Sequence, residues 1–453
     1  MNTPPDTPAQ ETIAALATPP GRGGIGVVRV SGPQVCQLAT ALLGSVPTPR
    51  YATYQPFSDS RGETIDIGIA LYFPAPHSFT GEDVLELQGH GGAIVMDRLL
   101  REIYQHAVRP ARAGEFSQRA FLNGKIDLTQ AEAIADLIAA ESEAAAEAAL
   151  RSLKGDFSAA IHLLVEALIA LRCYIEAAID FPDEEIDFLQ RGDVAARLQQ
   201  LLQQIERINQ TAQQGSLLRE GMRVVLAGLP NAGKSSLLNA LAGEDRAIVT
   251  DIAGTTRDLL QQEINLDGMP LHIIDTAGLR ESSCEIEQEG IRRAWGAIAQ
   301  ANLVLLIIDS CHSEQQQAEN ARLIAKLPPH IPLRKVFTKI DICTNNNSSE
   351  QIEGNLLSSK TGVGLDQLKQ DLKQIMGYHG DTEGCFMARR RHLQALNLAT
   401  GHLQTAISQL HLHCAELVAE ELRLTQQQLE MITGHFGSDD LLGRIFSSFC
   451  IGK

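Results

Sequence analysis

Apolar runs of strand length recur in the first quarter of the chain. Residues 26–30, 67–73 and 84–88 are apolar or alternate apolar with polar positions, and turns rich in glycine and proline separate them. This pattern is typical of short strands with one buried face. We therefore expect residues 12 to about 120 to form a mixed α/β domain.

After Leu128 the apolar positions change to helical spacing. Ile134, Leu137 and Ile138 lie three and four residues apart within 129–153, a segment rich in alanine, glutamate and leucine. Helical segments are also expected at 157–180, 193–214, 387–410 and 414–432. Because these segments flank the middle of the chain, we predict a discontinuous helical domain with an inserted module whose two ends lie close together.

The inserted module alternates buried strands with polar loops. Apolar runs at 224–227, 271–274 and 303–308 predict strands, and the first leads directly into Gly228-Leu229-Pro230-Asn231-Ala232-Gly233-Lys234-Ser235. This octapeptide fits G-x-x-x-x-G-K-[ST], a loop whose N–H groups and following helix bind phosphate. We expect Lys234 to reach the β- and γ-phosphates and the Ser235 hydroxyl to bind Mg²⁺.

Three further loops complete a GTPase pattern. Asp275-Thr276-Ala277-Gly278 matches D-x-x-G, and Thr256 in the polar loop 251–258 is the candidate second Mg²⁺ ligand. In Thr338-Lys339-Ile340-Asp341, the Asp would accept two hydrogen bonds from guanine. Thr338 stands where Asn is usual, so we expect looser packing of this loop. The residues expected to contact the nucleotide are Asn231, Ala232, Gly233, Lys234, Ser235, Ser236, Thr250, Thr255, Thr256, Asp275, Thr276, Ala277, Gly278, Thr338, Lys339, Asp341, Ser358, Ser359 and Lys360.

The sequence indicates the groups that catalyse hydrolysis less clearly than those that bind the nucleotide. Leu279 stands where Ras-like enzymes place a glutamine that orients the attacking water, so either hydrolysis is slow or a carboxylate of the stretch 281–289 supplies that role. Asn231 and the loop 250–255 are similar to those of GTPases that bind K⁺ against the phosphates in place of an arginine finger. Oxygens of Asn231, Thr250, Ile252 and Thr255 would form the K⁺ shell.

Length, composition and charge bound the remaining possibilities. The chain of 453 residues is long enough for two to four domains, and we expect no apolar run that crosses a bilayer and no secretory signal at residues 1–11. The eight cysteines have no metal-ligand spacing, which indicates free thiols in a reducing cytoplasm. The net charge of −17 argues against a broad electrostatic grip on nucleic acid. We expect a cytoplasmic protein with no membrane contact.

Segments spread over nearly the whole chain resemble one family. Residues 18–23, 78–83, 231–239, 251–258 and 439–446, with the final Cys450-Ile451-Gly452-Lys453, are similar to the MnmE (TrmE) family of bacterial tRNA-modification GTPases. The resemblance implies a multidomain α/β and α+β fold. Residues 1–125 would form a folate-binding α+β domain like the aminomethyltransferases, 126–220 and 378–453 the two parts of the α-helical domain, and 221–377 an inserted Ras-like P-loop GTPase domain.

The resemblance also implies partners and a reaction. The chain would form a homodimer through its N-terminal domains and, with FAD-dependent MnmG, a heterotetramer or larger complex. Together they would add an aminomethyl or carboxymethylaminomethyl group at C5 of the wobble uridine of tRNA. Binding of GTP or GDP with Mg²⁺, and K⁺-activated hydrolysis of GTP, would drive conformational change rather than chemistry on the base.

Site residues follow from the same resemblance. Glu287 would orient the attacking water, and Lys234 would act on the phosphates. A one-carbon tetrahydrofolate, 5-formyl- or 5,10-methylene-tetrahydrofolate, would bind at Arg29, Glu86, Lys125 and Lys453. Arg29 lies inside an apolar strand, where an unpaired charge is costly, so we expect a specific partner for it. Cys450 would lie near the folate, either as a thiolate that assists the chemistry or as a small buried apolar side chain.

Two other classes of protein share the nucleotide motifs. A ribosome-assembly GTPase of the Era or Der type would act as a binding switch, although the chain lacks the second GTPase repeat of the Der type. A mechanical scaffold on a membrane would need an amphipathic basic helix, and none is evident in the sequence. The dense basic cluster 389–392 is either an RNA or partner contact or a solvated helix start.

Overall fold

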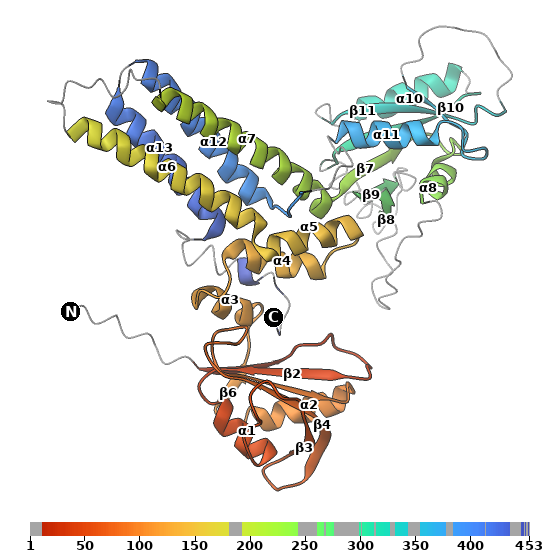
Figure 1. The fold of residues 1–453 in the computed structure, drawn as a ribbon. Helices are drawn as coiled ribbons and strands as arrows, with labels where there is room; N and C mark the ends of the chain where they lie inside the picture. The colour runs from red at the N-terminus through yellow and green to blue at the C-terminus, as the bar shows by residue number, and fades with distance from the viewer. Residues whose placement is uncertain are drawn as a thin grey trace. The chain divides into compact units, whose positions relative to one another are not determined.

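The computed structural model describes residues 11–180, 193–242, 261–266, 269–275, 299, 301–311, 314–326, 331–342, 354–376, 384–412, 414–434, 445–447, 449 and 452. Two compact units contain these residues. The first includes Met1–Ala135, Leu153–Phe188 and Cys414–Lys453, and the second includes Asp136–Ser152 and Leu189–His413. Each unit is built around one sheet, and each also contains a pair of long helices (Figure 1).

The first unit contains the mixed sheet predicted for the N-terminal quarter. Its strands are β1 (Thr12–Leu16), β2 (Gly26–Ser31), β3 (Thr53–Ser58), β4 (Thr64–Phe73), β5 (Val84–Gly89) and β6 (Val108–Pro110), in the order β3-β4-β5-β2-β1-β6. The helices α1 (Val35–Leu43) and α2 (Ala93–Ile103) share one apolar cluster with the strands, including Val28 and Val30, so they cover one face. The helix α3 (Glu115–Leu122) places Phe116 against Ile13 and Ala15 on the other face.

A buried ionic network fixes α3 in this unit. Glu115 is 3% exposed and accepts hydrogen bonds from the Arg109 guanidinium at 2.6 and 2.8 Å and from Arg119 at 3.1 Å. Burial alone raises the pKa of Glu115, but hydrogen bonds from Arg109, from the Arg112 N–H and from Arg119 outweigh it and lower that pKa to about 2. The carboxylate therefore stays charged down to strongly acidic pH and holds the start of α3 in place.

Two helices of the first unit pair along their length. They are α6 (Asp156–Asp180) and α13 (Ala415–Thr433), and buried Ile161, Leu168 and Ile175 lie on α6. The expectation of no membrane-length apolar run was wrong for this helix, because Asp156–Ile179 has 24 residues and contains an 18-residue stretch with a mean hydropathy of 1.6. By length and composition alone, this helix could cross a bilayer. Its buried residues Ile161, Leu168 and Ile175 are seven positions apart, which is typical of the face by which a helix packs against another helix.

The second unit contains a doubly covered sheet. Its strands are β7 (Met222–Ala227), β8 (Gln261–Leu266), β9 (Met269–Asp275), β10 (Leu303–Asp309), β11 (Leu333–Thr338) and β12 (Asn355–Leu356), in the order β12-β11-β10-β7-β9-β8. Only β8 pairs antiparallel within this sheet. The helices α8 (Lys234–Ala242) and α11 (Leu365–Ile375) pack on one face, and α10 (Glu314–Lys326) packs on the other. This is the layered α/β module predicted in the middle of the chain.

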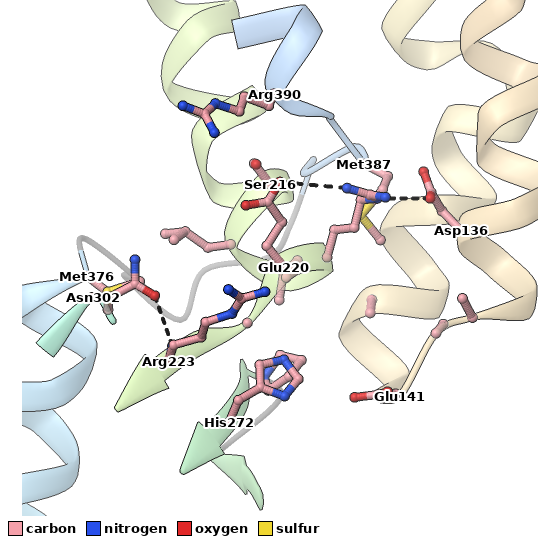
Figure 2. A pocket seen from close by; sticks show the side chains of 18 residues that line it. Asp136, Glu141, Ser216, Glu220, Arg223, His272, Asn302, Met376, Met387 and Arg390 are labelled. Atoms are coloured by element: carbon pink, nitrogen blue, oxygen red, sulfur yellow. Dashed lines mark hydrogen bonds and ion pairs between the residues drawn. The ribbon is translucent and has the colours of Figure 1, made fainter. Parts of the chain in front are cut away.

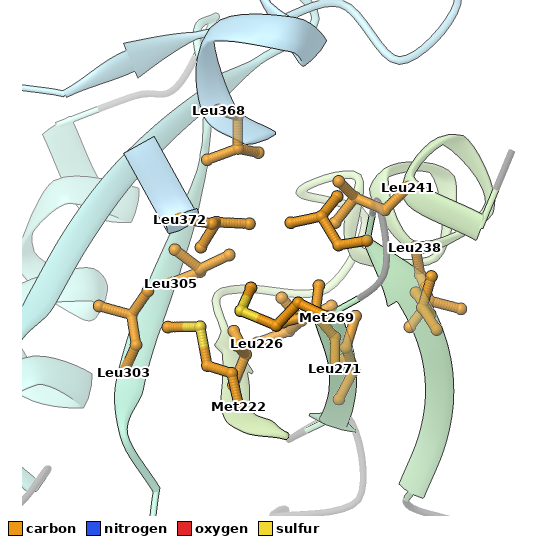
Figure 3. Close-up of a cluster of buried hydrophobic side chains, with 14 of the residues drawn as sticks. Met222, Leu226, Leu238, Leu241, Met269, Leu271, Leu303, Leu305, Leu368 and Leu372 are labelled. Atoms are coloured by element: carbon orange, nitrogen blue, oxygen red, sulfur yellow. The ribbon is translucent and has the colours of Figure 1, made fainter. Parts of the chain in front are cut away.

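Helices of the predicted helical segments complete the second unit. They are α7 (Asp193–Glu220) and α12 (Arg390–His411), which pair with each other, and α5 (Glu143–Lys154), which follows α4 (Leu128–Ile138). The segment 129–153 is divided because the Ser142 hydroxyl accepts the Ala145 N–H at 3.1 Å and so caps a new helix. Ala145, Ala148 and Ala149 of α5 join the same apolar core as the sheet residues shown in Figure 3.

Candidate functional site

The phosphate loop connects β7 to α8 in the geometry that its sequence predicts. Gly228 has φ of 151°, and a Cβ there would lie 2.4 Å from the Ile307 carbonyl oxygen. Gly233 has φ of 98°, directly before α8 begins at Lys234. Both positions need glycine because L side chains rarely adopt these angles. The loop therefore brings backbone N–H groups and a helix N-terminus to one concave turn, which suits phosphate.

Lys234 supplies the positive charge of this turn. Its side chain is buried, and Nζ donates to the carbonyl oxygens of Gly228 at 2.8 Å and Leu229 at 3.1 Å. Ser235 and Ser236 follow on the exposed side of α8, and Asn231 is exposed with φ of 62°. A lysine held against its own loop, beside exposed hydroxyl groups, fits a nucleoside triphosphate with a divalent cation.

The segment that the sequence predicts to select guanine, residues 338–341, begins at the last residue of β11 and is held by side-chain contacts. The Ser358 hydroxyl donates to Oδ1 of Asp341 at 2.7 Å, and Ser358 is fully buried. Lys339 has φ of 61°, and its Nζ contacts Oδ2 of Asp309 at 2.6 Å. Ser359 and Lys360 continue the turn that begins at Ser358. The carboxylate of Asp341 is thus fixed in orientation before any base binds.

Thr338 does not loosen this loop in the way the sequence suggested. Its hydroxyl is buried and lies 2.6 Å from the carbonyl oxygen of Ala232, in the phosphate loop, and 3.2 Å from that of Ile308. A hydroxyl has one proton to donate, and the shorter contact is to Ala232. Thr338 therefore ties the loop that carries Asp341 to the phosphate loop, a contact that the sequence alone did not predict.

Removing this hydroxyl should weaken nucleotide binding without unfolding the sheet. Thr338→Val keeps the side-chain shape but leaves the Ala232 carbonyl without its donor, so affinity for GDP should fall about fivefold, the equivalent of one net hydrogen bond. Thr338→Ser keeps the hydroxyl and should bind GDP within about twofold of the parent chain. Titration of each variant with a fluorescent GDP analogue measures both values. If Thr338→Val binds GDP as tightly as the parent chain, the hydrogen bond from Thr338 to Ala232 does not contribute to nucleotide binding.

Several predicted nucleotide-site residues lie outside the described residues. They are Thr250, Ile252, Thr255, Thr256, Thr276, Ala277, Gly278 and Glu287. Asp275 ends β9, next to Leu226 of β7 in the sheet register, but its side chain is not among those described. The described part of the site therefore comprises the phosphate loop and the loops of residues 338–341 and 358–360.

A second group of predicted residues gathers on the N-terminal sheet. Arg29 of β2 and Glu86 of β5 are direct neighbours in the antiparallel register, and Arg29 Nε donates to Oε1 of Glu86 at 2.9 Å. The expected partner of Arg29 is thus a residue of this chain. Both side chains remain partly exposed, at 23% and 17%, so the pair is accessible to a ligand.

Two aromatic rings confine the Arg29 guanidinium. Its Cζ lies 5.6 Å from the ring centroid of Phe79 and 5.8 Å from that of Phe116. Sequence reasoning missed both rings, although Phe79 lies in the segment 78–83 that carried part of the resemblance. Lys125 is close to this segment, because its Nζ donates to the Pro76 carbonyl oxygen at 3.0 Å.

The end of the chain returns to the same sheet. The Gly452 carbonyl oxygen accepts from Nη1 of Arg29 at 3.5 Å, and a Cβ on Gly452 would lie 2.2 Å from the Leu16 carbonyl oxygen. Phe446 and Phe449 pack with Leu128 and Ala131 in one apolar cluster. Cys450 and Lys453 lie outside the described residues, but Gly452 between them lies at the Arg29 site.

The described sheet and its loops define the class of protein. The strand order, the phosphate loop after β7 and the position of Asp341 after β11 are those of a P-loop GTPase with Ras-like topology. Profiles of the MnmE helical domain and of the TrmE N-terminus, described as that of a GTP-binding protein, match residues 128–450 and 12–125. The chain belongs to the MnmE family.

Full-length relatives agree with this assignment. A protein of Sodalis glossinidius named tRNA modification GTPase MnmE is 59% identical over 98% of this chain and 99% of its own length. One of Histophilus somni with the same name is 58% identical over 98% of this chain and 100% of its own length. The Era and Der alternative is not favoured by these matches.

Two solved structures with related sequence match part of the chain. A variant of Era from Aquifex aeolicus bound to GDP·AlF₄⁻ is 24% identical, with a TM-score of 0.26, over 40% of this chain and 66% of its own. The G domain of the FeoB iron transporter from T. maritima is 28% identical, with a TM-score of 0.25, over 34% of this chain and 98% of its own. The assignment to the MnmE family does not depend on either.

Proposed function

We propose that this chain binds and hydrolyses GTP and that the hydrolysis serves the modification of tRNA. The observation that carries the proposal is the nucleotide site, in which the phosphate loop and Asp341 are linked through Thr338. The full-length relatives named tRNA modification GTPases support the second half. Asp341 would select guanine, and Lys234 would leave the loop carbonyls to contact the phosphates.

Two metal ions are part of the proposed nucleotide site. Ser235 and Thr256 would hold Mg²⁺, which neutralises phosphate charge when bound. Asn231 with Thr250, Ile252 and Thr255 would hold K⁺, and the exposed, positive-φ position of Asn231 at the loop supports an outward-facing amide oxygen. Glu287 would orient the attacking water, because Leu279 cannot.

Potassium dependence tests the hydrolytic half of the proposal. GTP hydrolysis by the pure protein should be at least about tenfold faster in KCl than in NaCl at equal concentration, because K⁺ would replace the charge of an arginine finger, a contribution of about a thousandfold or more. Asn231→Ala should lose the difference, while Asn239→Ala, an exposed asparagine within α8, should keep it. Equal rates in both salts would contradict the K⁺ assignment.

The N-terminal sheet is proposed as the site of a one-carbon tetrahydrofolate. The Arg29 and Glu86 pair, confined by Phe79 and Phe116, offers a cation and a carboxylate of fixed geometry, which suits the amide-like edge of a pterin. Lys125 and Lys453 would neutralise the carboxylates of the folate tail, and Cys450 would lie beside the one-carbon unit. When bound, the folate would supply that carbon to the uridine.

Further partners follow from family membership. We propose a homodimer formed through the N-terminal domains and a complex with FAD-dependent MnmG that acts on C5 of the wobble uridine. The group added would be aminomethyl or carboxymethylaminomethyl, and the site of action the cytoplasm. Hydrolysis of GTP would change the relative arrangement of the chain's parts rather than act on the base.

A further inference from the structure

One buried carboxylate joins the two ends of the inserted GTPase module. Asp136, in α4, has a side chain that is 7% exposed. Its Oδ1 accepts from Arg219 Nε at 3.0 Å and from Arg389 Nη2 at 2.8 Å, and its Oδ2 accepts from Arg389 Nε at 3.3 Å. Arg219 lies in the last turn of α7, just before β7, and Arg389 directly precedes α12. Within the basic cluster 389–392, Arg389 therefore forms a structural ion pair with Asp136.

The segment that leaves the module is held at further points. The Met387 N–H donates to the Ala148 carbonyl oxygen at 3.2 Å, and the Ser152 hydroxyl donates to the Met387 carbonyl oxygen at 3.2 Å. A Cβ on Gly215 of α7 would lie 1.9 Å from the Phe386 carbonyl oxygen, so α7 and the leaving segment are in backbone contact. These contacts confirm the prediction that the ends of the module lie close together.

Beside these contacts the junction is hollow. A cavity of about 940 Å³ lies at the amino ends of the strands, away from the phosphate loop, and Asp136, Arg223, His272, Asn302 and Met387 are among its lining residues (Figure 2). The Asp136 carboxylate lines this space, so its polar contacts add to the apolar packing of α5 in aligning the helices with the sheet.

We infer that Asp136 is the positioning residue through which nucleotide-dependent movement of the GTPase sheet reaches α5 and α12. The inference rests on the proposed GTPase function. A movement of β7 shifts Arg219, while Arg389 moves with the leaving segment, and both cations share one carboxylate. Buried ion pairs at an interface favour discrete arrangements over continuous sliding, because a partly separated pair leaves a desolvated charge.

Hydrogen exchange of the full chain in two nucleotide states tests this coupling. In the parent chain, amides of α5 and of the first turns of α12 should exchange at different rates with GDP and with a non-hydrolysable GTP analogue. Asp136→Asn should reduce that difference at least about fivefold, while the difference in α8 beside the phosphate loop remains. Asp136→Glu, which keeps the charge, should recover part of it. A purely structural role would instead raise exchange equally in both nucleotide states.

Variants of the two arginines keep the test independent of whether Asp136→Asn folds. Arg219→Gln and Arg389→Gln should each lower the nucleotide-dependent difference, and adding Arg219→Gln to Asp136→Asn should change it by less than about twofold, because the partner is already gone. Glu420→Gln, which breaks the exposed pair with Arg423, is the matched control and should change nothing.

The outcomes separate this inference from the proposed function. A parent chain that does not hydrolyse GTP overturns the proposed function itself. If the parent chain hydrolyses GTP, two results would overturn the inference alone. One is that amide exchange in α5 and α12 does not differ between the nucleotide states. The other is that this difference in exchange survives unchanged in Asp136→Asn and in both arginine variants.

Discussion

Asp341→Asn lowers the affinity for GTP by a factor of about 100 or more and makes xanthosine triphosphate the better ligand. The carboxylate would accept two hydrogen bonds from guanine, and each hydrogen bond to a charged group contributes about 1.5–3 kcal/mol. An amide can instead donate to the C2 oxygen that xanthine has in place of the amino group. The Ser358 hydroxyl, 2.7 Å from Oδ1, can still hold the substituted side chain.

Competition between GTP and xanthosine triphosphate for a fluorescent guanine nucleotide measures this exchange of specificity. Asp309→Asn, which removes the carboxylate that pairs with Lys339, is the matched control and should keep the preference for guanine. An Asp341→Asn variant that retains a preference for GTP would place guanine recognition elsewhere.

Lys234→Met reduces GTP hydrolysis by about a thousandfold and weakens GTP binding. A unit charge about 4 Å from another contributes on the order of 4 kcal/mol at an effective dielectric constant of about 20, which corresponds to this factor. Met has a similar length and is apolar, so the buried stem of the side chain keeps its packing. The protein should therefore stay folded, since the loop carbonyls that Nζ now contacts lie at the open phosphate site.

Single-turnover hydrolysis with saturating GTP separates this effect on rate from the effect on binding. Lys369→Met, on α11, is the charge-matched control and should hydrolyse GTP at the parent rate. A hydrolysis rate within about tenfold of the parent chain in Lys234→Met would show that this lysine does not act on the phosphates.

The sequence predicted the elements with strong local signals. The phosphate loop could be placed because glycine at 228 and 233 permits angles that other residues rarely adopt, and because an apolar strand precedes it. The helix boundary at Ser142 was not predicted, since one capping hydroxyl divides a segment whose apolar spacing continues. The apolar length of α6 was also misjudged.

Contacts between distant segments could not be read from the sequence. Phe79 and Phe116 surround Arg29 because α3 and the loop that carries Phe79 pack on the same face of one sheet. Asp136 is separated from Arg219 by 83 positions and from Arg389 by 253, and no local pattern reports such a pairing. The tie from Thr338 to Ala232 likewise depends on two loops at the ends of separate strands.

The most direct measurement is the modification of tRNA by the purified chain together with the proposed FAD-dependent partner, with GTP or with a non-hydrolysable GTP analogue. Mass spectrometry of the nucleosides reports the product at C5 of the wobble uridine. We expect modified uridine with GTP and at least about tenfold less with the analogue, because hydrolysis would drive the conformational change. Equal modification with both nucleotides would contradict the central claim that this GTPase acts in tRNA modification by hydrolysing GTP.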